Sequence, residues 1–323
     1  MRYCVFGLGA VGGYIGGRLA AAGLDVCAVA RGDTFASVRR HGLRLEGSSA
    51  DTVVRIPVVD SVSEVGPVDC VLLAVKATAL PAAAPLVASL LGPDTVIVPM
   101  MNGVPWWFTH HLPSPLTGLH LPEVDPGGTI SASLPPSRVI PAVVHFNATV
   151  PRPGTVRLGA GNRIIVGDPS GTHADALAAV ARDLAVTGLD VDTSDVIHRA
   201  VWFKLWGNMT FNPISAITGA TADLIVADPL AVEFIESCMH EANDVGTALG
   251  LPVAQSPTER IDLTRQMGPI KSSMLQDAEA SRPLELDAIL GSVVALGSAL
   301  GIATPNLRGL LGLARVFATA HGL

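Results

Sequence analysis

Apolar and polar positions follow two different patterns in the two parts of this chain. Up to about residue 195, short apolar runs alternate with longer stretches rich in alanine and leucine. The short runs are near-continuously apolar and of strand length, which is typical of buried parallel strands, and they cover residues 2–6, 25–30, 69–74 and 95–99. The stretches between them predict helices over residues 11–22, 34–41 and 78–91. This alternation predicts a doubly wound α/β fold with a parallel sheet.

Further strand-like runs follow, and the pattern then changes. Residues 43–45 and 53–56 predict a small hairpin, and residues 139–146, 156–158 and 163–166 predict later strands at the far edge of the sheet. After residue 195 the pattern predicts only helices, over residues 196–217, 230–249, 258–267, 283–300 and 306–320. We therefore expect one domain over residues 1–195 and an all-helical domain over residues 196–323. Residues 105–136, rich in proline, glycine and aromatic residues, have no clear period and predict a long loop of the kind that is usually functional or mobile.

Composition narrows the classes of function. The 323 residues include 49 % hydrophobic and 15 % charged residues, enough apolar surface for a large core, so disorder is excluded. The net charge of −7 and the lack of a basic run argue against a nucleic-acid partner. The uncharged stretch 288–307 contains glycines, serines, a proline and an asparagine, so we expect a core helix there and no membrane span. Four cysteines without a CxxC pair favour core packing in a reducing cytoplasm.

A glycine motif follows the first predicted strand. Its residues are Gly7, Leu8, Gly9, Ala10, Val11 and Gly12, and they open the first predicted helix. In such a motif the first glycine permits a tight turn, the second lets a pyrophosphate approach the backbone, and the third lets helix and strand pack closely. The helix N-terminus then offers free N–H groups to the phosphates. The strand–turn–helix context predicts a dinucleotide-binding loop.

The end of the second predicted strand bears on which dinucleotide binds. An acid at this point would accept hydrogen bonds from the ribose of NAD, but here the strand ends in Arg31, and Asp33 lies beyond Gly32. A guanidinium complements the 2′-phosphate of NADP. The position favours NADP, the alternative being an ordinary solvent-exposed arginine.

A stripe of polar residues marks the first helix of the second domain. Lys204, Asn208 and Asn212 are spaced i, i+4 and i+8, so they share one face of a helix whose other positions are largely aromatic or aliphatic. Burying such groups without partners is costly, so the stripe should face something polar. The two interpretations are a substrate-facing stripe and a set of internally satisfied core groups.

Four further positions are candidates for the same site. Lys76 and Asn102 each follow a predicted strand at its carboxyl end, where ligands bind in open α/β sheets. Ser273 and Glu285 bracket a turn-like stretch in the helical domain. Each has an ordinary structural explanation, such as a turn or a helix cap, so it is their combination that points to a site.

Taken together, these residues resemble the ketopantoate reductase family. The resemblance rests on the run GLGAVGG, on Arg31, Lys76 and Asn102-Gly103, on the Lys204/Asn208/Asn212-Pro213 spacing, and on SSMLQD followed by Glu285. It spans nearly the whole chain with the motifs in order, and it implies a Rossmann domain followed by a helical domain similar to that of 6-phosphogluconate dehydrogenase. It also implies reduction of ketopantoate to pantoate by NADPH, a step toward pantothenate and coenzyme A.

The resemblance further implies roles for individual residues. The proton donor would be Lys204, and Glu285 would lie near it and near the nicotinamide ribose. The substrate would be held by Asn208, Asn212 and Ser273. Contacts to both cofactor and substrate would come from Lys76 and Asn102. The chemistry agrees, because hydride transfer to a ketone leaves negative charge on oxygen, which an ammonium group can stabilise and protonate.

Two features depart from the family pattern. The segment after Gly103, which begins Val-Pro-Trp-Trp-Phe, is longer than in compact members and adds His110, His111, His120 and acidic residues. A substrate-holding asparagine of the family appears here as Thr221 or Ala222. Both affect substrate recognition more than hydride transfer. The histidine spacing fits no standard metal motif, so we expect no metal site.

Other functions stay open at this point. The protein could be a related NADP-dependent reductase or dehydrogenase that acts on a different 2-oxo or 3-hydroxy acid. The long segment after Gly103 is the reason to keep this alternative. A non-catalytic NADP-sensing protein is a third interpretation, although such a protein would have no reason to keep Lys204 and Glu285 together. As for oligomeric state, a homodimer is the general expectation, because it is the commonest arrangement of soluble enzymes.

Overall fold

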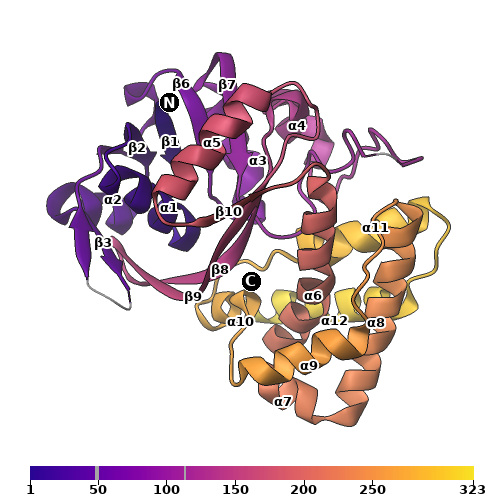
Figure 1. Cartoon of the computed structure of the whole chain (residues 1–323). Helices are drawn as coiled ribbons and strands as arrows, with labels where there is room; N and C mark the ends of the chain where they lie inside the picture. Colours follow the sequence, from indigo (N-terminus) through magenta and orange to yellow (C-terminus); the bar gives the residue numbers. More distant parts are fainter. Residues whose placement is uncertain (48–50, 113) are drawn as a thin grey trace. The chain divides into compact units, whose positions relative to one another are not determined.

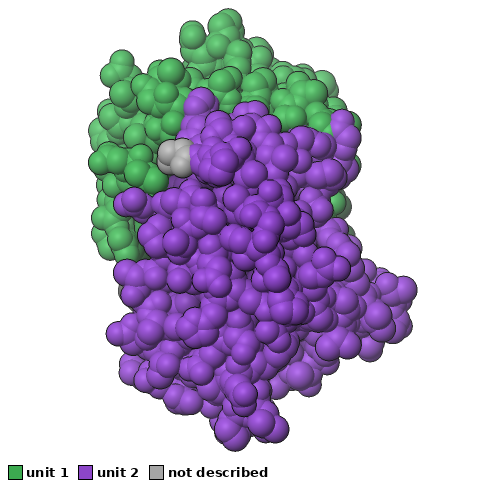
Figure 2. Space-filling model, turned by 90° about the vertical axis from the view of Figure 1, so that its right-hand side faces the viewer, with its two compact units in different colours: residues 1–101, 128–197 green, residues 102–127, 198–323 purple. Residues whose placement is uncertain are grey.

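The computed structural model describes residues 1–47, 51–112 and 114–323. Figure 1 shows the path of the chain, and Figure 2 shows the residues that form its two compact units. Unit 1 comprises residues 1–101 and 128–197, and unit 2 comprises residues 102–127 and 198–323. The boundary after residue 197 lies close to the one expected at residue 195. Residues 102–127, which we expected in the first domain, belong instead to unit 2.

The first sheet of unit 1 has the order β5-β2-β1-β6-β7, and every neighbouring pair is parallel. Its strands are β1 (Tyr3–Phe6), β2 (Val26–Val29), β5 (Val58–Val59), β6 (Val68–Leu73) and β7 (Leu91–Pro99). The helices that connect them are α1 (Ala10–Ala21), α2 (Gly32–His41) and α3 (Leu80–Ala88). The predicted doubly wound sheet of Rossmann type is confirmed. The third helix is shorter than expected, because residues 77–79 form a 3₁₀ turn and β7 already begins at Leu91.

A second sheet corrects the expectation that the later strands extend the first one. It runs β10-β9-β3-β4, with β8 paired to β9, and contains β3 (Leu43–Glu46), β4 (Thr52–Val54), β8 (Ala142–Arg152), β9 (Thr155–Val166) and β10 (Asp190–Thr193). Strands β3 and β4 form the expected antiparallel hairpin. Because β3 pairs in parallel with β9, this hairpin and the later strands build one sheet. Unit 1 also contains α4 (Thr129–Ser133) and α5 (Ala174–Val186).

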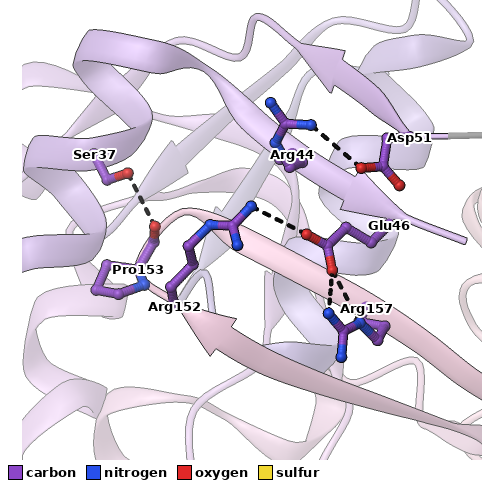
Figure 3. A network of polar contacts seen from close by, with 7 residues as sticks. All are labelled: Ser37, Arg44, Glu46, Asp51, Arg152, Pro153 and Arg157. Carbon is purple, nitrogen blue, oxygen red and sulfur yellow. Dashed lines mark hydrogen bonds and ion pairs between the residues drawn. The ribbon is translucent and has the colours of Figure 1, made fainter.

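Polar contacts attach β3 and α2 to the adjoining ends of β8 and β9 and to the turn between them (Figure 3). Glu46 accepts hydrogen bonds from Arg152, at 3.1 Å, and from Arg157, at 2.9 Å. The hydroxyl of Ser37 on α2 donates to the carbonyl of Pro153 in the turn, at 2.9 Å. Exposed ion pairs contribute only about 0–1 kcal/mol each, so we regard these contacts as aids to strand register more than as sources of stability.

Helix α1 packs against both sheets through its small residues. A Cβ atom on Gly16 would lie 2.8 Å from the Val5 side chain in β1. A Cβ on Gly13 would lie 2.7 Å from Val156 in β9, and one on Gly17 would lie 2.9 Å from Leu45 in β3. Larger side chains at these positions would push the sheets away from the helix. The glycines of α1 therefore let one helix serve the hydrophobic core between two sheets.

In the described residues of unit 2, the regular secondary structure is helical, and residues 102–125 form turns and irregular structure. Its helices are α6 (Ile197–Thr218), which begins at the unit boundary, α7 (Ala222–Ala227), α8 (Pro229–Ala248), α9 (Pro257–Met267), α10 (Ser273–Glu279), α11 (Ser292–Ala299) and α12 (Pro305–His321), with a π-helical turn at Asp287–Gly291 before α11. Side chains cap several of them. Asp228 accepts from two N–H groups of α8, and Ser256 and Glu259 form a capping box at α9.

Aromatic packing explains why residues 102–127 belong to unit 2. Trp107 and Phe108 are buried, and their rings lie 5.5 Å and 5.3 Å from the ring of His198, at the start of α6. Phe108 also stacks on Trp202 one turn further along α6, with ring centroids 6.1 Å apart. The tryptophan pair Trp106-Trp107 is thus a packing anchor for this segment. Pro113 of the segment lies outside the described residues.

Among the described residues, no helix is both long enough and apolar enough to cross a membrane.

Candidate functional site

The predicted dinucleotide loop connects the end of β1 to the start of α1 in unit 1. Gly7 has a φ of +102°, a conformation that L side chains rarely adopt, and its N–H donates to the Val29 carbonyl at 3.0 Å. A Cβ there would also lie 3.0 Å from the carbonyl oxygen of Ala74. Gly7 is therefore required by the turn itself. The side chain of Leu8 is buried and anchors the loop, while Gly9 is exposed.

The other two glycines of the motif differ in what requires them. A Cβ on Gly12 would lie 2.1 Å from the Gly7 carbonyl oxygen and 2.7 Å from the Cβ of Ala74, so close packing within the chain accounts for this glycine. A Cβ on Gly9 would meet no atom of the chain within 4 Å. The fold does not explain Gly9, whereas close approach of a pyrophosphate does. The loop thus fits a dinucleotide.

The start of α1 can also hold negative charge. Gly9 is the N-cap residue and gives no side-chain hydrogen bond to the helix, and the first turn, from Ala10 and Val11 onward, contains no acid. The N–H groups of this turn have no partner within the helix, and the helix dipole adds positive potential there. These are the features that bind phosphate at a helix N-terminus.

Two further candidates of unit 1 lie just beyond strand ends. Arg31 is the N-cap residue of α2 and is exposed, as is Asp33 in the first turn of that helix. Within the part of the chain that the structure describes, the Arg31 guanidinium makes no hydrogen bond or ion pair, so it is available to an anionic ligand. Lys76 follows β6, is exposed, and precedes the 3₁₀ turn Ala77–Ala79.

The polar stripe of unit 2 lies on α6, on a helix that is otherwise mostly buried. Lys204 and Asn208 are half-buried, and Asn212 is 7 % exposed. The opposite side of the helix is filled by large core residues, among them Trp202 and Trp206, and the Trp206 indole donates to the Met239 carbonyl of α8 at 2.9 Å. These anchors fix the rotation of α6 about its axis, and with it the direction of the stripe.

Lys204 and Glu285 are electrostatically coupled within unit 2. Burial lowers the pKa of Lys204 to about 8, while the Glu285 carboxylate acts in the opposite direction and favours the charged ammonium. Glu285 is itself 4 % exposed. A buried carboxylate beside a buried ammonium keeps the lysine protonated near neutral pH and ready to release its proton.

The backbone around Glu285 also positions Asn102. A Cβ on Gly103, whose φ is +84°, would lie 2.4 Å from the Ala288 carbonyl oxygen, and the next N–H, that of Val104, donates to the same oxygen at 2.7 Å. Ala288 lies in the π-helical turn that follows Glu285. Such turns are frequent at functional sites. This close backbone contact brings the half-buried Asn102 into the same part of unit 2 as Glu285.

Ser273 occupies the first position of α10 and is exposed. The capping role belongs to its neighbour Ser272, whose hydroxyl accepts from the Leu275 N–H at 3.0 Å. The Ser273 hydroxyl is therefore not needed by the helix. A buried carboxylate, Asp277, accepts from Arg282 at 2.9 Å and holds the connection that leads from α10 to Glu285.

The candidate residues thus divide between the two units. The loop Gly7–Gly12, Arg31 and Lys76 are in unit 1, and Asn102, Lys204, Asn208, Asn212, Ser273 and Glu285 are in unit 2. The sequence reading missed Arg260, a partly buried arginine whose guanidinium lies over Gly207 of α6. The signal for it was Gly207, a glycine inside a long helix between Lys204 and Asn208.

Comparison with known proteins gives consistent matches. The family model "Ketopantoate reductase PanE/ApbA" matches residues 3–171, and its C-terminal counterpart matches residues 196–318. The 2-dehydropantoate 2-reductase of Mesorhizobium japonicum is 39 % identical over 323 residues, which cover 100 % of this chain and 99 % of the relative.

Solved structures extend the likeness to the fold. A crystal structure from Ralstonia solanacearum, of a protein assigned as a ketopantoate reductase, is 43 % identical with a TM-score of 0.95, and covers 100 % of this chain and 99 % of that one. D-mandelate dehydrogenase with NADH and anilino(oxo)acetate has a TM-score of 0.85 at 22 % identity, covering 100 % of both chains, a likeness of fold alone. The chain therefore belongs to the ketopantoate reductase family and is an oxidoreductase acting between a carbonyl and an alcohol.

Proposed function

We propose that this protein reduces a 2-oxo acid with NADPH and that its substrate is ketopantoate. The product would be pantoate, on the route to pantothenate and coenzyme A. The observation that carries the proposal is Lys204, half-buried on the amide-bearing face of α6 and electrostatically coupled to the buried Glu285. Family membership implies a nicotinamide cofactor, and the loop Gly7–Gly12 has the shape to hold its pyrophosphate.

The residues of unit 2 have separate roles in this proposal. NADPH, when bound, supplies the hydride. The ammonium of Lys204 stabilises the negative charge that grows on the substrate's carbonyl oxygen and then donates a proton to that oxygen. Glu285 keeps Lys204 charged and oriented. Asn102, Asn208, Asn212 and Ser273 offer amide and hydroxyl groups that hydrogen-bond to the carboxylate and hydroxyl of the substrate.

Steady-state oxidation of NADPH tests this function. Purified protein is assayed with ketopantoate and with a panel of other 2-oxo acids, of which pyruvate is small and benzoylformate is bulky. We expect kcat/KM to be highest for ketopantoate by at least about tenfold. NADPH oxidation with none of these acids, by protein that still binds NADPH, would favour the sensing protein and contradict the proposal.

The second candidate function is reduction of a different acid by the same chemistry. Residues 102–127 favour it, because Gly103 packs on the turn that follows Glu285 and a buried aromatic cluster fixes this long segment on α6. In the same assay, a preference for another 2-oxo acid, or oxidation of a 3-hydroxy acid with NADP⁺, would support this candidate over ketopantoate.

Arg31 gives a prediction about cofactor choice. We expect Arg31→Ala to lower the affinity for NADPH by about 10- to 100-fold and to leave that for NADH unchanged, because a charge-assisted pair is worth about 1.5–3 kcal/mol. Arg39→Ala on the exposed side of the same helix is the matched control and should change neither. Fluorescence titration with each dinucleotide measures both constants. An equal loss for NADH and NADPH would show that Arg31 does not read the 2′-phosphate.

The pKa of Lys204 gives a prediction about pH. Burial lowers that pKa to about 8, and only the protonated lysine can act as the acid in reduction. We therefore expect kcat/KM for the 2-oxo acid to be level below about pH 7 and to fall about tenfold per pH unit above pH 8. A profile measured at saturating NADPH checks this. A fall that begins only near pH 10, where an ordinary lysine titrates, would contradict the assignment.

A further inference from the structure

A partly buried arginine of unit 2 lies beside the Lys204 stripe, and the described residues hold no anion that neutralises it. Arg260 belongs to α9, whose start is fixed by the capping box of Ser256 and Glu259. From there its side chain reaches α6, where its guanidinium carbon lies 5.7 Å from the centroid of the Phe203 ring. It is therefore held by packing on an aromatic face.

Gly207 provides the space that the guanidinium occupies. A Cβ built on Gly207 would lie 2.4 Å from one terminal nitrogen of Arg260, 2.8 Å from its Nε and 3.0 Å from its central carbon. A glycine inside a 22-residue helix lowers helix propensity, so its presence needs a reason, and the guanidinium supplies one. Any side chain at this position would displace Arg260.

The position of Gly207 places this charge next to the candidate site. Gly207 immediately precedes Asn208, and it follows Lys204 by three residues, which on a helix puts their Cβ positions about 5–6 Å apart. The guanidinium therefore lies on the part of α6 that bears the proton donor. All of these residues are in unit 2.

The described part of the chain offers Arg260 no counter-ion. Its Nε is buried without a hydrogen-bond partner. The nearest acids on its own helix are engaged elsewhere, Glu259 with the capping box and Asp262 with Arg265. Burial lowers the pKa of Arg260, and no neighbouring carboxylate opposes this shift. By contrast, Arg282 and Arg315 each pair with an aspartate.

We propose that Arg260 binds the carboxylate group of the substrate, so that the acid is held by Arg260 while its adjacent carbonyl oxygen is presented to Lys204. This inference rests on the proposed function and names the residue that selects acids over neutral ketones. A guanidinium is the side chain that matches a carboxylate in two parallel hydrogen bonds, and a buried one that lacks a counter-ion binds an anion most strongly. The carboxylate and carbonyl of a 2-oxo acid are directly bonded, which suits two cations rooted at neighbouring helix positions.

The test compares Arg260→Gln with wild type on two substrates, ketopantoate and its neutral lactone, which keeps the ketone but lacks the carboxylate. We expect kcat/KM for the acid to fall about 100-fold and that for the lactone to change by less than about threefold. Arg265→Gln is the matched control, since it removes the same charge from the exposed side of the same helix and should leave both unchanged.

A binding measurement makes the test independent of turnover on the lactone. Oxamate, a 2-oxo acid analogue, is titrated calorimetrically into the NADPH complex, and we expect Arg260→Gln to weaken its binding about 100-fold while NADPH affinity stays the same. Gly207→Ala should weaken oxamate binding similarly, because the added methyl displaces the guanidinium. The double variant should be no weaker than either single one.

Stability separates this role from a purely structural one. Arg260→Gln removes a buried charge without a counter-ion, so we expect its Tm to equal or exceed that of wild type. A lower Tm with equal losses on acid and lactone would mean that Arg260 only supports α6, and Arg260→Lys, which keeps the charge, would then restore activity on both. If the wild-type protein reduces 2-oxo acids and the Arg260→Gln variant reduces them equally well, the inference is overturned and the proposed function stays intact. Absence of reduction by wild type would instead refute the proposed function.

Discussion

Lys204→Met is expected to lower kcat for reduction of the 2-oxo acid by about 10²- to 10⁴-fold, the usual contribution of a positioned general acid. Methionine fills nearly the same space but offers neither charge nor proton. The affinity for NADPH should stay within about threefold of wild type, because the proposed dinucleotide loop is in unit 1 and Lys204 is in unit 2. Single-turnover kinetics with preloaded NADPH would separate this loss from any change in cofactor binding.

The control for this variant is Lys271→Met. Lys271 is exposed and forms an ion pair with Glu279 at 2.6 Å, so its loss should leave kcat unchanged. Lys204→Met also leaves the buried Glu285 without its cation, which should lower stability. Adding Glu285→Gln should recover the Tm and leave kcat low. A Lys204→Met variant with near-normal kcat would remove Lys204 from the chemistry.

Gly12→Val is expected to abolish measurable dinucleotide binding. Even a Cβ at this position would lie 2.1 Å from the Gly7 carbonyl oxygen, so α1 or the loop must shift. Overpacking of this kind costs about 1–3 kcal/mol or more in free energy of unfolding, and it deforms the turn that should hold the pyrophosphate. Tm and NADPH titration on the same sample would report both effects.

Gly9→Ala completes this second prediction. It shows whether a glycine is needed at this position for dinucleotide binding or for the stability of the fold. A methyl group at Gly9 would touch no atom of the chain, so the Tm should match that of wild type. NADPH binding should nevertheless weaken by about tenfold or more, because the methyl keeps the pyrophosphate from the backbone. Gly309→Ala, which also adds a methyl in open space, is the control and should bind NADPH normally. Unchanged NADPH affinity in Gly9→Ala would contradict the loop's proposed role.

Local patterns predicted four of the five strands of the first sheet and the longer helices of unit 2, but not the two-residue strand β5 or the short helices α7 and α10. The parallel strands of the first sheet are short buried runs separated by helices, so their type and order follow from neighbouring residues. The pairing of β3 with β9 does not, because it joins Arg44 to Thr155, far apart in the sequence. Strand-like patterns at 43–45 and 156–158 indicate strands but not their partners. The extra glycines of α1, Gly13 and Gly17, were the available signal that a second sheet packs on that helix.

The candidate site was partly predictable for similar reasons. The spacing of Lys204, Asn208 and Asn212 is a local property of one helix, so their common face could be predicted. Glu285 was a candidate only through its place beside a turn-like stretch, and the resemblance related it to Lys204, to which it is electrostatically coupled. The place of residues 102–127 depends on contacts of Trp107 and Phe108 with His198, which no local pattern encodes. Arg260 is one of several charged residues on α9, and only its contact with Gly207 distinguishes it from the others.

The central claim is that this protein reduces the carbonyl of a 2-oxo acid with NADPH. Transfer of an isotope label from the cofactor to the product tests this claim most directly. The protein is incubated with ketopantoate and NADPH carrying deuterium at C4 of the nicotinamide, and the product is analysed by mass spectrometry and NMR. The account predicts pantoate with one deuterium at C2, and loss of that product in Lys204→Met. Two results would contradict the account. One is pantoate that lacks deuterium at C2 whichever face of C4 carries the label, and the other is consumption of NADPH without formation of a hydroxy acid.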